Sequence, residues 1–216
     1  MYKLNLHAHT QYSDGGGTIK TMAEEYRKQG FSCAVITDHW YTRNDLSHYS
    51  MTYDKFLKAI EDAKQVQKEL DYPVIIGVEY GFFCCEEVLC FGRDFIHALY
   101  KGVKSIEEFG ELRKKYPSVC VLCHPGDASA FIEMGGVNVV DGYELYNSGQ
   151  YMFSRREVPK EFKNLTAFSN SDAHGIGTMR FGYNFVNEDI KSEEQLIKFI
   201  NKKKFVQPHI IDEKSL

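Results

Sequence analysis

Histidine and acidic residues recur at one kind of place in this sequence, directly after short apolar runs. The segments that succeed these runs read His-Ala-His, Thr-Asp-His, Glu-Tyr, His-Pro, Tyr-Asn and Asn-Ser-Asp-Ala-His. Runs of this length are typical of parallel strands buried on both faces, and the carboxyl ends of such strands meet at one face of a barrel. The pattern therefore predicts a polar site at a barrel mouth. The runs are residues 3–6, 33–36, 73–78, 119–123, 139–145 and 165–168.

Helical segments are expected between most of these runs. In one of them, Ser105 followed three residues later by Glu108 predicts a capping box at the helix start. An exception is residues 87–99, where two short runs on either side of Gly92 and Arg93 predict a β-hairpin. Alternating strands and helices favour an α/β fold with a parallel sheet or barrel. The predicted helices are residues 18–29, 53–70, 105–116 and 192–202.

The length of 216 residues fits a single domain over residues 1–216. A hydrophobic share of 43% and a charged share of 26% are ordinary for a soluble globular protein. The net charge of -4 disfavours a long nucleic acid or a membrane surface as partner, since both attract excess Lys and Arg. The sequence shows neither a membrane-spanning run nor the apolar region of a signal peptide, so we expect a cytoplasmic location. The oligomeric state cannot be predicted.

The six cysteines lie mostly inside apolar runs, which fits reduced, buried thiols better than a disulfide framework. Cys120 and Cys123 have the spacing of a redox or zinc motif. On a strand, however, residues three apart point to opposite faces. We therefore expect these two thiols to belong to the core.

Two pairs of potential ligands have the geometry to share one ion. His7 and His9 are separated by one residue on an expected strand, so both imidazoles lie on the same face. Asp172 and His174 repeat this spacing near the other end of the chain. Two such pairs, with further ligand types at the strand ends between them, are difficult to explain as core packing.

Four further residues extend this set. Asp14 lies in a Ser-Asp-Gly turn soon after His9, where it can fold back toward a metal. Glu79 ends a buried apolar run, where an unpaired carboxylate would be costly unless it bound a cation. His39 and His124 leave their strands directly into loops.

These segments, taken together, resemble the successive motifs of the PHP (polymerase and histidinol phosphatase) family. The resemblance covers about residues 3–190, with the motifs in the same order. The segments that carry it are His7-Ala-His9-Thr10, Ser13-Asp14-Gly15, Ile36-Thr37-Asp38-His39, Gly77-Val78-Glu79, Cys123-His124-Pro125 and Asn170-Ser171-Asp172-Ala173-His174.

The resemblance implies a distorted (β/α)7 TIM-like barrel that holds two or three divalent metal ions at the carboxyl ends of its strands. The ligands implied for one ion are His7, His9, Glu79 and Asp172. Those implied for a second are Asp14, His39 and His174, and those for a third or shared position are Glu79 and His124. The residues expected to take part directly in catalysis are Glu79, Asp14 and His39.

The chain departs from the resemblance at one position. Members with three ions place another histidine after the glutamate, near the position of Leu89, and none is present there. Cys90 is an alternative ligand, whereas His97 lies too far along the chain. We therefore expect two well-occupied ions rather than three.

The expected chemistry depends on the ligand types. Imidazole and oxygen ligands suit Mn, Fe or Zn without distinguishing among them. Two such cations lower the pKa of a water between them and clamp the oxygens of a phosphoryl group. We therefore expect hydrolysis of a phosphate ester, with a small phosphorylated metabolite or nucleotide as substrate.

Four residues are candidates for substrate contact. Arg180 follows the last ligand pair and has the side chain to bind a phosphate in bidentate fashion. Arg43 and His48 lie in the segment after His39, and Asn147 lies at the end of an expected strand.

Two other classes of function remain open from the sequence. The first is an amidohydrolase or a small-oligonucleotide nuclease on the same barrel, because activated water attacks carbonyl and phosphodiester groups as well. The second is a non-catalytic domain that binds metal and regulates a partner.

Overall fold

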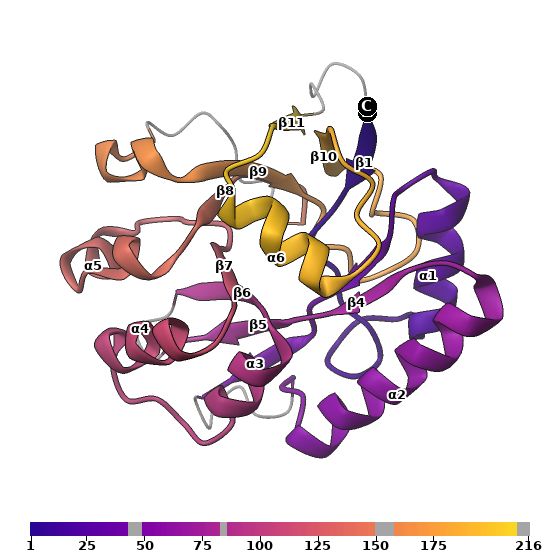
Figure 1. Ribbon diagram of the computed structural model, residues 1–216, viewed down its shortest axis with the longest axis horizontal. Helices are drawn as coiled ribbons and strands as arrows, with labels where there is room; N and C mark the ends of the chain where they lie inside the picture. The colour runs from indigo at the N-terminus through magenta and orange to yellow at the C-terminus, as the bar shows by residue number, and fades with distance from the viewer. Residues whose placement is uncertain (43–48, 83–85, 150–157, 211–216) are drawn as a thin grey trace.

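The computed structural model describes residues 1–42, 49–82, 86–149 and 158–210. Strands form the centre of the molecule, with helices packed around them (Figure 1). The strands are β1 (Tyr2–Leu4), β2 (Ala34–Ile36), β3 (His39–Tyr41), β4 (Val74–Ile76), β5 (Val78–Gly81), β6 (Glu87–Phe91), β7 (Val119–Leu122), β8 (Gly142–Asn147), β9 (Thr166–Asn170), β10 (Gly182–Val186) and β11 (Val206–Ile210). The helices are α1 (Ile19–Lys28), α2 (Tyr53–Leu70), α3 (Arg93–Leu99), α4 (Ile106–Lys115), α5 (Ser129–Glu133) and α6 (Glu193–Asn201), with short 3-10 helices η2 (Gly136–Val139) and η3 (Lys160–Asn164).

The predicted α/β barrel is confirmed, and it is distorted. β2 pairs in parallel with β4, and β3 with β5, while β3-β5-β6-β7-β8-β9 form one sheet. The segment after β1 closes the ring. On one side Thr37 donates its backbone N–H to Ala8 (2.8 Å), and on the other His9 donates to Ala173 (2.9 Å). β6 runs antiparallel to both of its neighbours, which is the main departure from a regular barrel.

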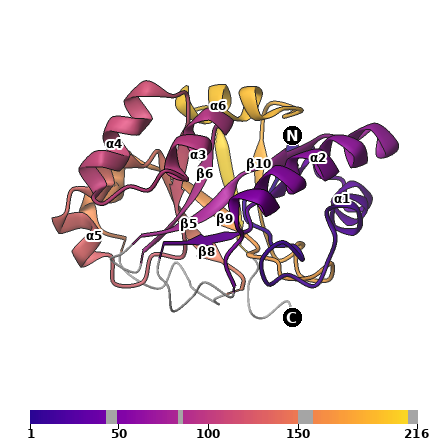
Figure 2. The same ribbon diagram turned by 90° about the horizontal axis from the view of Figure 1, so that it is seen from below.

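Apolar side chains form two layers, one inside the barrel and one between the barrel and its helices. Leu6, Val35, Leu89 and Phe168 belong to the inner layer. α6 adds its own apolar face to that layer and closes the end of the barrel opposite the mouth where the strands β3 and β5 end (Figure 2). As predicted, Cys120 and Cys123 point to opposite faces. Cys120, in β7, lies in the outer layer, and Cys123, just after β7, lies in the inner layer.

The predicted helices form within a residue of their expected bounds. α2 matches its prediction at both ends. The hydroxyl of Ser105 caps α4 by accepting from the backbone N–H of Glu108 (3.2 Å). The Glu108 carboxylate accepts from Lys104 (2.7 Å), one residue earlier than a standard capping box requires.

The predicted hairpin at residues 87–99 is wrong, because its second half is helix α3. Gly92 ends β6 at a φ of 115°, a backbone conformation that favours glycine. The carboxylate of Glu193, at the start of α6, accepts from the backbone N–H groups of Gly92 (3.0 Å) and Arg93 (3.3 Å). It thus satisfies donors that a helix start leaves unpaired. Phe95 and Leu99 then lie on one buried helical face.

Other elements also differ from expectation. His39 begins strand β3 instead of leaving a strand into a loop, and the run at residues 73–78 is divided between β4 and β5. The run at residues 139–145 becomes a strand only from Gly142, since Asp141 turns to accept from Arg113 (2.6 Å) and from the Cys120 backbone (2.8 Å). β10 and β11 were not predicted, and they pair with β1 in a small antiparallel sheet. Within the described ranges, no helix has the length and apolarity to cross a bilayer.

Candidate metal centre

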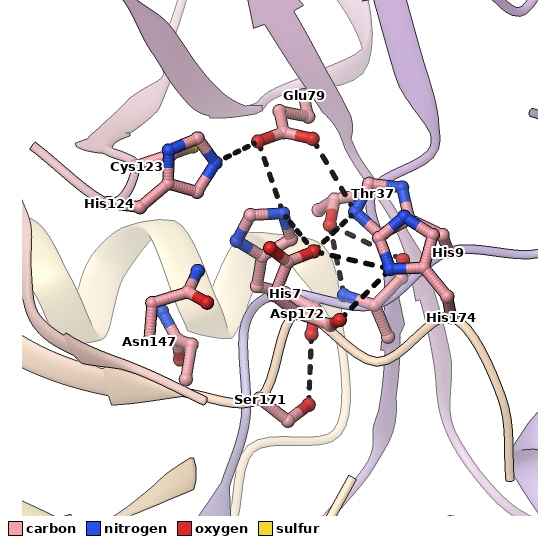
Figure 3. Close-up of polar contacts among 12 residues, drawn as sticks. His7, His9, Thr37, Glu79, Cys123, His124, Asn147, Ser171, Asp172 and His174 are labelled. Atoms are coloured by element: carbon pink, nitrogen blue, oxygen red, sulfur yellow. Dashed lines mark hydrogen bonds and ion pairs between the residues drawn. The ribbon is translucent and has the colours of Figure 1, made fainter. Parts of the chain in front are cut away.

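Eight residues at or near the strand ends converge at one mouth of the barrel, although they span nearly the whole sequence. His7 and His9 follow β1, His39 begins β3, Glu79 lies in β5, His124 follows β7, and Asp172 and His174 follow β9. Asp14 comes from the loop after His9. Figure 3 shows the side chains of His7, His9, Glu79 and Asp172 pointing toward one another.

The first group of ligand atoms surrounds the carboxylate of Asp172. Its Oδ1 lies 3.0 Å from Nε2 of His9 and 3.4 Å from Nε2 of His7. Glu79 completes the group, with Oε1 3.2 Å from Nε2 of His7 and Oε2 3.4 Å from Nε2 of His9. The side chains of His7, His9 and Glu79 are fully buried.

The second group is built on Asp14. Its carboxylate lies 3.3 Å from Nε2 of His174, 3.5 Å from Nε2 of His39 and 3.9 Å from Nδ1 of His9. Gly15 makes this possible, because a Cβ there would lie 2.5 Å from the carbonyl of His9. Only glycine lets the loop fold so closely onto the strand that carries the histidine.

A third group lies on the other side of Glu79. Nε2 of His124 is 3.1 Å from Oε1 of Glu79 and 3.3 Å from Oε2 of Glu87. Sγ of Cys123 lies within 4.8 Å of ligand atoms of His7, Glu79 and His124. Neither Glu87 nor Cys123 was among the sequence candidates.

These residues fit divalent metal ions, because several of their buried polar atoms have no hydrogen-bond partner in the described part of the chain. Buried polar atoms are normally hydrogen-bonded, because leaving them unpaired costs on the order of 1–3 kcal/mol each. Several atoms of the centre lack a hydrogen-bond partner among the described residues, and all are of metal-ligating type. They are Nε2 of His7, Nδ1 and Nε2 of His9, Oε2 of Glu79 and Oδ1 of Asp172.

The charges of the centre also favour cation binding. Burial alone would raise the pKa of Glu79, but His7 and His39 hold it well below its usual range. Burial would lower the pKa of His39, yet Glu79 and Asp14 raise it to about 10. Glu79 thus stays ionised, and a metal that binds beside His39 must displace a proton from its imidazole.

Glu144 supports the ligands from inside the barrel, and sequence reasoning missed it. Its Oε1 accepts from Nδ1 of His7 (2.8 Å) and Nδ2 of Asn170 (2.9 Å). Its Oε2 accepts from the His124 backbone and from Nδ2 of Asn147, both at 2.8 Å. Because a carboxylate only accepts, Nδ1 of His7 donates to it, and Nε2 is the ring nitrogen that would face a metal. The available signal was an acidic residue inside the apolar run Tyr-Glu-Leu-Tyr.

Two of the ligands adopt unusual backbone conformations. His124 has a φ of 23° and Asp172 a φ of 52°, values that residues other than glycine adopt rarely. Such conformations persist where the surrounding structure enforces them, and they cluster at functional sites. Here they turn the chain at the strand ends so that both side chains face the centre.

The candidate substrate residues divide into three cases. Arg180 is exposed, with its guanidinium carbon 4.8 Å from the centre of the Phe181 ring. Asn147 is buried and donates to Glu144 (2.8 Å). Arg43 and His48 lie outside the described residues. Their contact with a substrate stays a prediction for all four.

A barrel whose mouth gathers histidines and carboxylates in overlapping groups defines a candidate polynuclear metal centre. The family model described as PHP domain matches residues 5–202, and the chain therefore belongs to the PHP domain family. Among proteins with curated functions, none matches the chain significantly.

Solved structures share the fold at low sequence identity. A two-domain protein from Bacteroides vulgatus, which contains a predicted PHP-like metal-dependent phosphoesterase, aligns with a TM-score of 0.66 and 18% identity over 97% of this chain and 64% of that one. PsfC from Pseudomonas syringae aligns with a TM-score of 0.63 and 12% identity over 99% of this chain and 93% of that one. The lesion-specific endonuclease PfuEndoQ from Pyrococcus furiosus aligns with a TM-score of 0.60 and 15% identity over 98% of this chain and 59% of that one. The chain thus spans less than two thirds of the first and third of these proteins, and the likeness concerns the fold.

Proposed function

We propose that this protein is a metal-dependent phosphoesterase that hydrolyses a small phosphorylated compound. The observation that carries the proposal is the set of buried, unsatisfied ligand atoms around Glu79 and Asp172. Membership of the PHP domain family and the phosphoesterase domain named for the Bacteroides vulgatus protein support it.

The residues present have the chemistry for this reaction. His7, His9, Glu79 and Asp172 would hold one divalent ion, and Asp14, His39 and His174 a second. Such ions, when bound, would supply positive charge for the phosphoryl oxygens and would lower the pKa of an attacking water. Glu79 lies between the groups, where its two oxygens reach different histidines. Its ionised carboxylate would serve as a ligand in more than one of these groups, and Glu144 accepts a hydrogen bond from the ring of His7.

A cavity whose lining includes Pro125, the residue after His124, has the size of a small-molecule site. It has a volume of about 480 Å³ and is lined partly by Pro125 and Gly126, which follow His124 directly. Glu144 contributes to the same wall, while Val158 and Phe162 supply apolar surface. Pockets of a few hundred Å³ hold metabolite-sized ligands. The cavity therefore has room for the leaving group of a small phosphate ester.

The charge of this cavity argues against a polyanionic substrate. Among its described lining residues, the exposed Asp127, Glu133 and Glu161 and the buried Glu144 are acidic, and none is Lys or Arg. A nucleic-acid groove needs basic residues along the phosphate backbone. We therefore favour a phosphomonoester over an oligonucleotide.

The proposal is tested by loading the purified protein with Mn²⁺, Fe²⁺ or Zn²⁺ and assaying three matched substrates: an aryl phosphomonoester, an aryl phosphodiester and an aryl amide. We expect hydrolysis of the monoester to be fastest, and to stop after chelation. Fastest turnover of the amide would support the amidohydrolase alternative, and fastest turnover of the diester the nuclease alternative. If no substrate reacts in any metal-loaded form, the non-catalytic alternative is favoured.

The acidic cavity leads to a prediction about leaving groups. Alkyl phosphomonoesters that carry an ammonium group should have a KM a few-fold lower than matched esters with a carboxylate. The expected difference is on the order of 1 kcal/mol, because three of the acidic residues are exposed and screened by solvent. Steady-state kinetics at low ionic strength measure it. An equal or reversed preference would show that these side chains do not face the bound leaving group.

A further inference from the structure

Glu87 occupies the level of the barrel mouth because β6 runs backward. In the antiparallel register of β5 and β6, Glu79 faces Leu89 and Gly81 faces Glu87. Glu87, Leu89 and Phe91 alternate onto one face of the strand, and the last two lie in the inner apolar layer. Leu89 is fully buried in that layer, level with Glu79 on the neighbouring strand. The residue that reaches the mouth from β6 in this chain is Glu87.

The carboxylate of Glu87 faces the ring of His124, which belongs to neither of the first two groups of ligand atoms. Its Oε2 lies 3.3 Å from Nε2 of His124, which is itself 3.1 Å from Oε1 of Glu79. Ligand atoms of His39, Glu79 and Glu87 also lie within 4.8 Å of one another. The hydroxyl of Tyr41 hydrogen-bonds to Glu87 and lies 2.9 Å from Nδ1 of His39, so the carboxylate is held in place.

The burial of these groups calls for a cation. The Glu79 side chain is fully buried, and that of Glu87 is 17% exposed. Two carboxylates that share one histidine in such surroundings need positive charge between them, and either a protonated imidazole or a bound metal ion can supply it. No Lys or Arg of the described chain forms an ion pair with either of them.

We propose that Glu87, together with Glu79 and His124, holds a third divalent cation, and that Glu87 replaces the histidine expected near position 89. The inference rests on the metal centre of the proposed function, and it replaces the expectation of two ions. Two carboxylates and one imidazole form a harder ligand set than one rich in histidine. The position should therefore discriminate against Mn²⁺ relative to Zn²⁺ less strongly than a histidine-rich position does.

The test counts ions without measuring activity. Chelator-stripped protein is titrated with Mn²⁺, and bound metal is measured by mass spectrometry after removal of free ion. We expect three ions per wild-type chain and two in Glu87→Gln, with the affinity of the third weakened at least about tenfold. The matched control is Glu86→Gln, since Glu86 is the adjacent glutamate and belongs to none of the ligand groups in the described chain. It should still bind three.

Saturation of the wild type at two ions would overturn the proposal, as would three unweakened ions in Glu87→Gln. If Glu87→Gln does not fold, anomalous diffraction from Mn²⁺-soaked wild-type crystals decides. A peak in contact with Glu87, Glu79 and His124 supports the proposal, and its absence at saturating Mn²⁺ refutes it. Glu87→His should retain three ions and shift the preference toward Zn²⁺. A protein with three ions and no hydrolysis would refute the proposed function alone, whereas an active protein with two would refute this inference alone.

Discussion

Asp172→Ala is expected to lower kcat/KM for phosphomonoester hydrolysis by about 10³-fold or more. Its Oδ1 is the atom nearest to Nε2 of His9 and also faces Nε2 of His7. Removing it takes away one of the two carboxylates that face both buried imidazoles, the other being Glu79. The ion of the first group should then bind weakly or not at all. His9→Ala should have a similar effect, because the His9 ring borders both the first and the second group.

The measurement combines steady-state kinetics with a metal count on the same preparations. Asp189→Ala is a suitable control, since that carboxylate is partly exposed and pairs with Lys191 at the surface. It should keep both activity and metal content. Asp172→Ala protein that retains full activity with a normal metal content would contradict the assignment of this ligand.

Glu144→Gln is expected to weaken metal binding by about 10- to 100-fold without removing a direct ligand. The carboxylate accepts four hydrogen bonds, from His7, Asn170, Asn147 and the His124 backbone. A glutamine amide has one oxygen, so its NH₂ group would face donors in place of the second oxygen. The ring of His7 and the backbone that carries His124 would lose their fixed positions as a result.

Competition with a chromogenic chelator measures this change in affinity. Activity at saturating metal should recover most of the wild-type rate, which separates a positioning role from a direct one. Glu61→Gln serves as control, because Glu61 forms only an exposed ion pair with Lys64 on α2. Unchanged metal affinity in Glu144→Gln would show that the hydrogen bonds to His7 and His124 are dispensable.

The sequence predicted the barrel and the convergence of its strand ends because both depend on local patterns. An i, i+2 pair such as His7 and His9 shares a face wherever it lies on a strand. Parallel strands then bring their carboxyl ends to one side of the barrel. The structure brings all eight candidate ligands together, and their binding of metal is the proposal that the experiments test.

The features that sequence reasoning missed depended on strand direction and on long-range contacts. The sequence predicted that β6 begins a hairpin, whereas it is followed by helix α3. The start of α3 is capped by Glu193, about a hundred residues away, and local patterns cannot reveal such a partner. With its direction known, the alternation of Glu87, Leu89 and Phe91 places the glutamate at the mouth. Glu144 was overlooked since its partners come from three other strand ends, and only the closed barrel makes it buried.

The proposed function requires that one cluster at the barrel mouth bind both metal and phosphate. Anomalous diffraction from crystals grown with Mn²⁺ and phosphate locates both at once. We predict peaks at the groups centred on Asp172 and Asp14, with phosphate oxygens in contact with the ions. Metal-saturated crystals in which those groups hold no ion, or in which phosphate binds away from them, would contradict the proposed function.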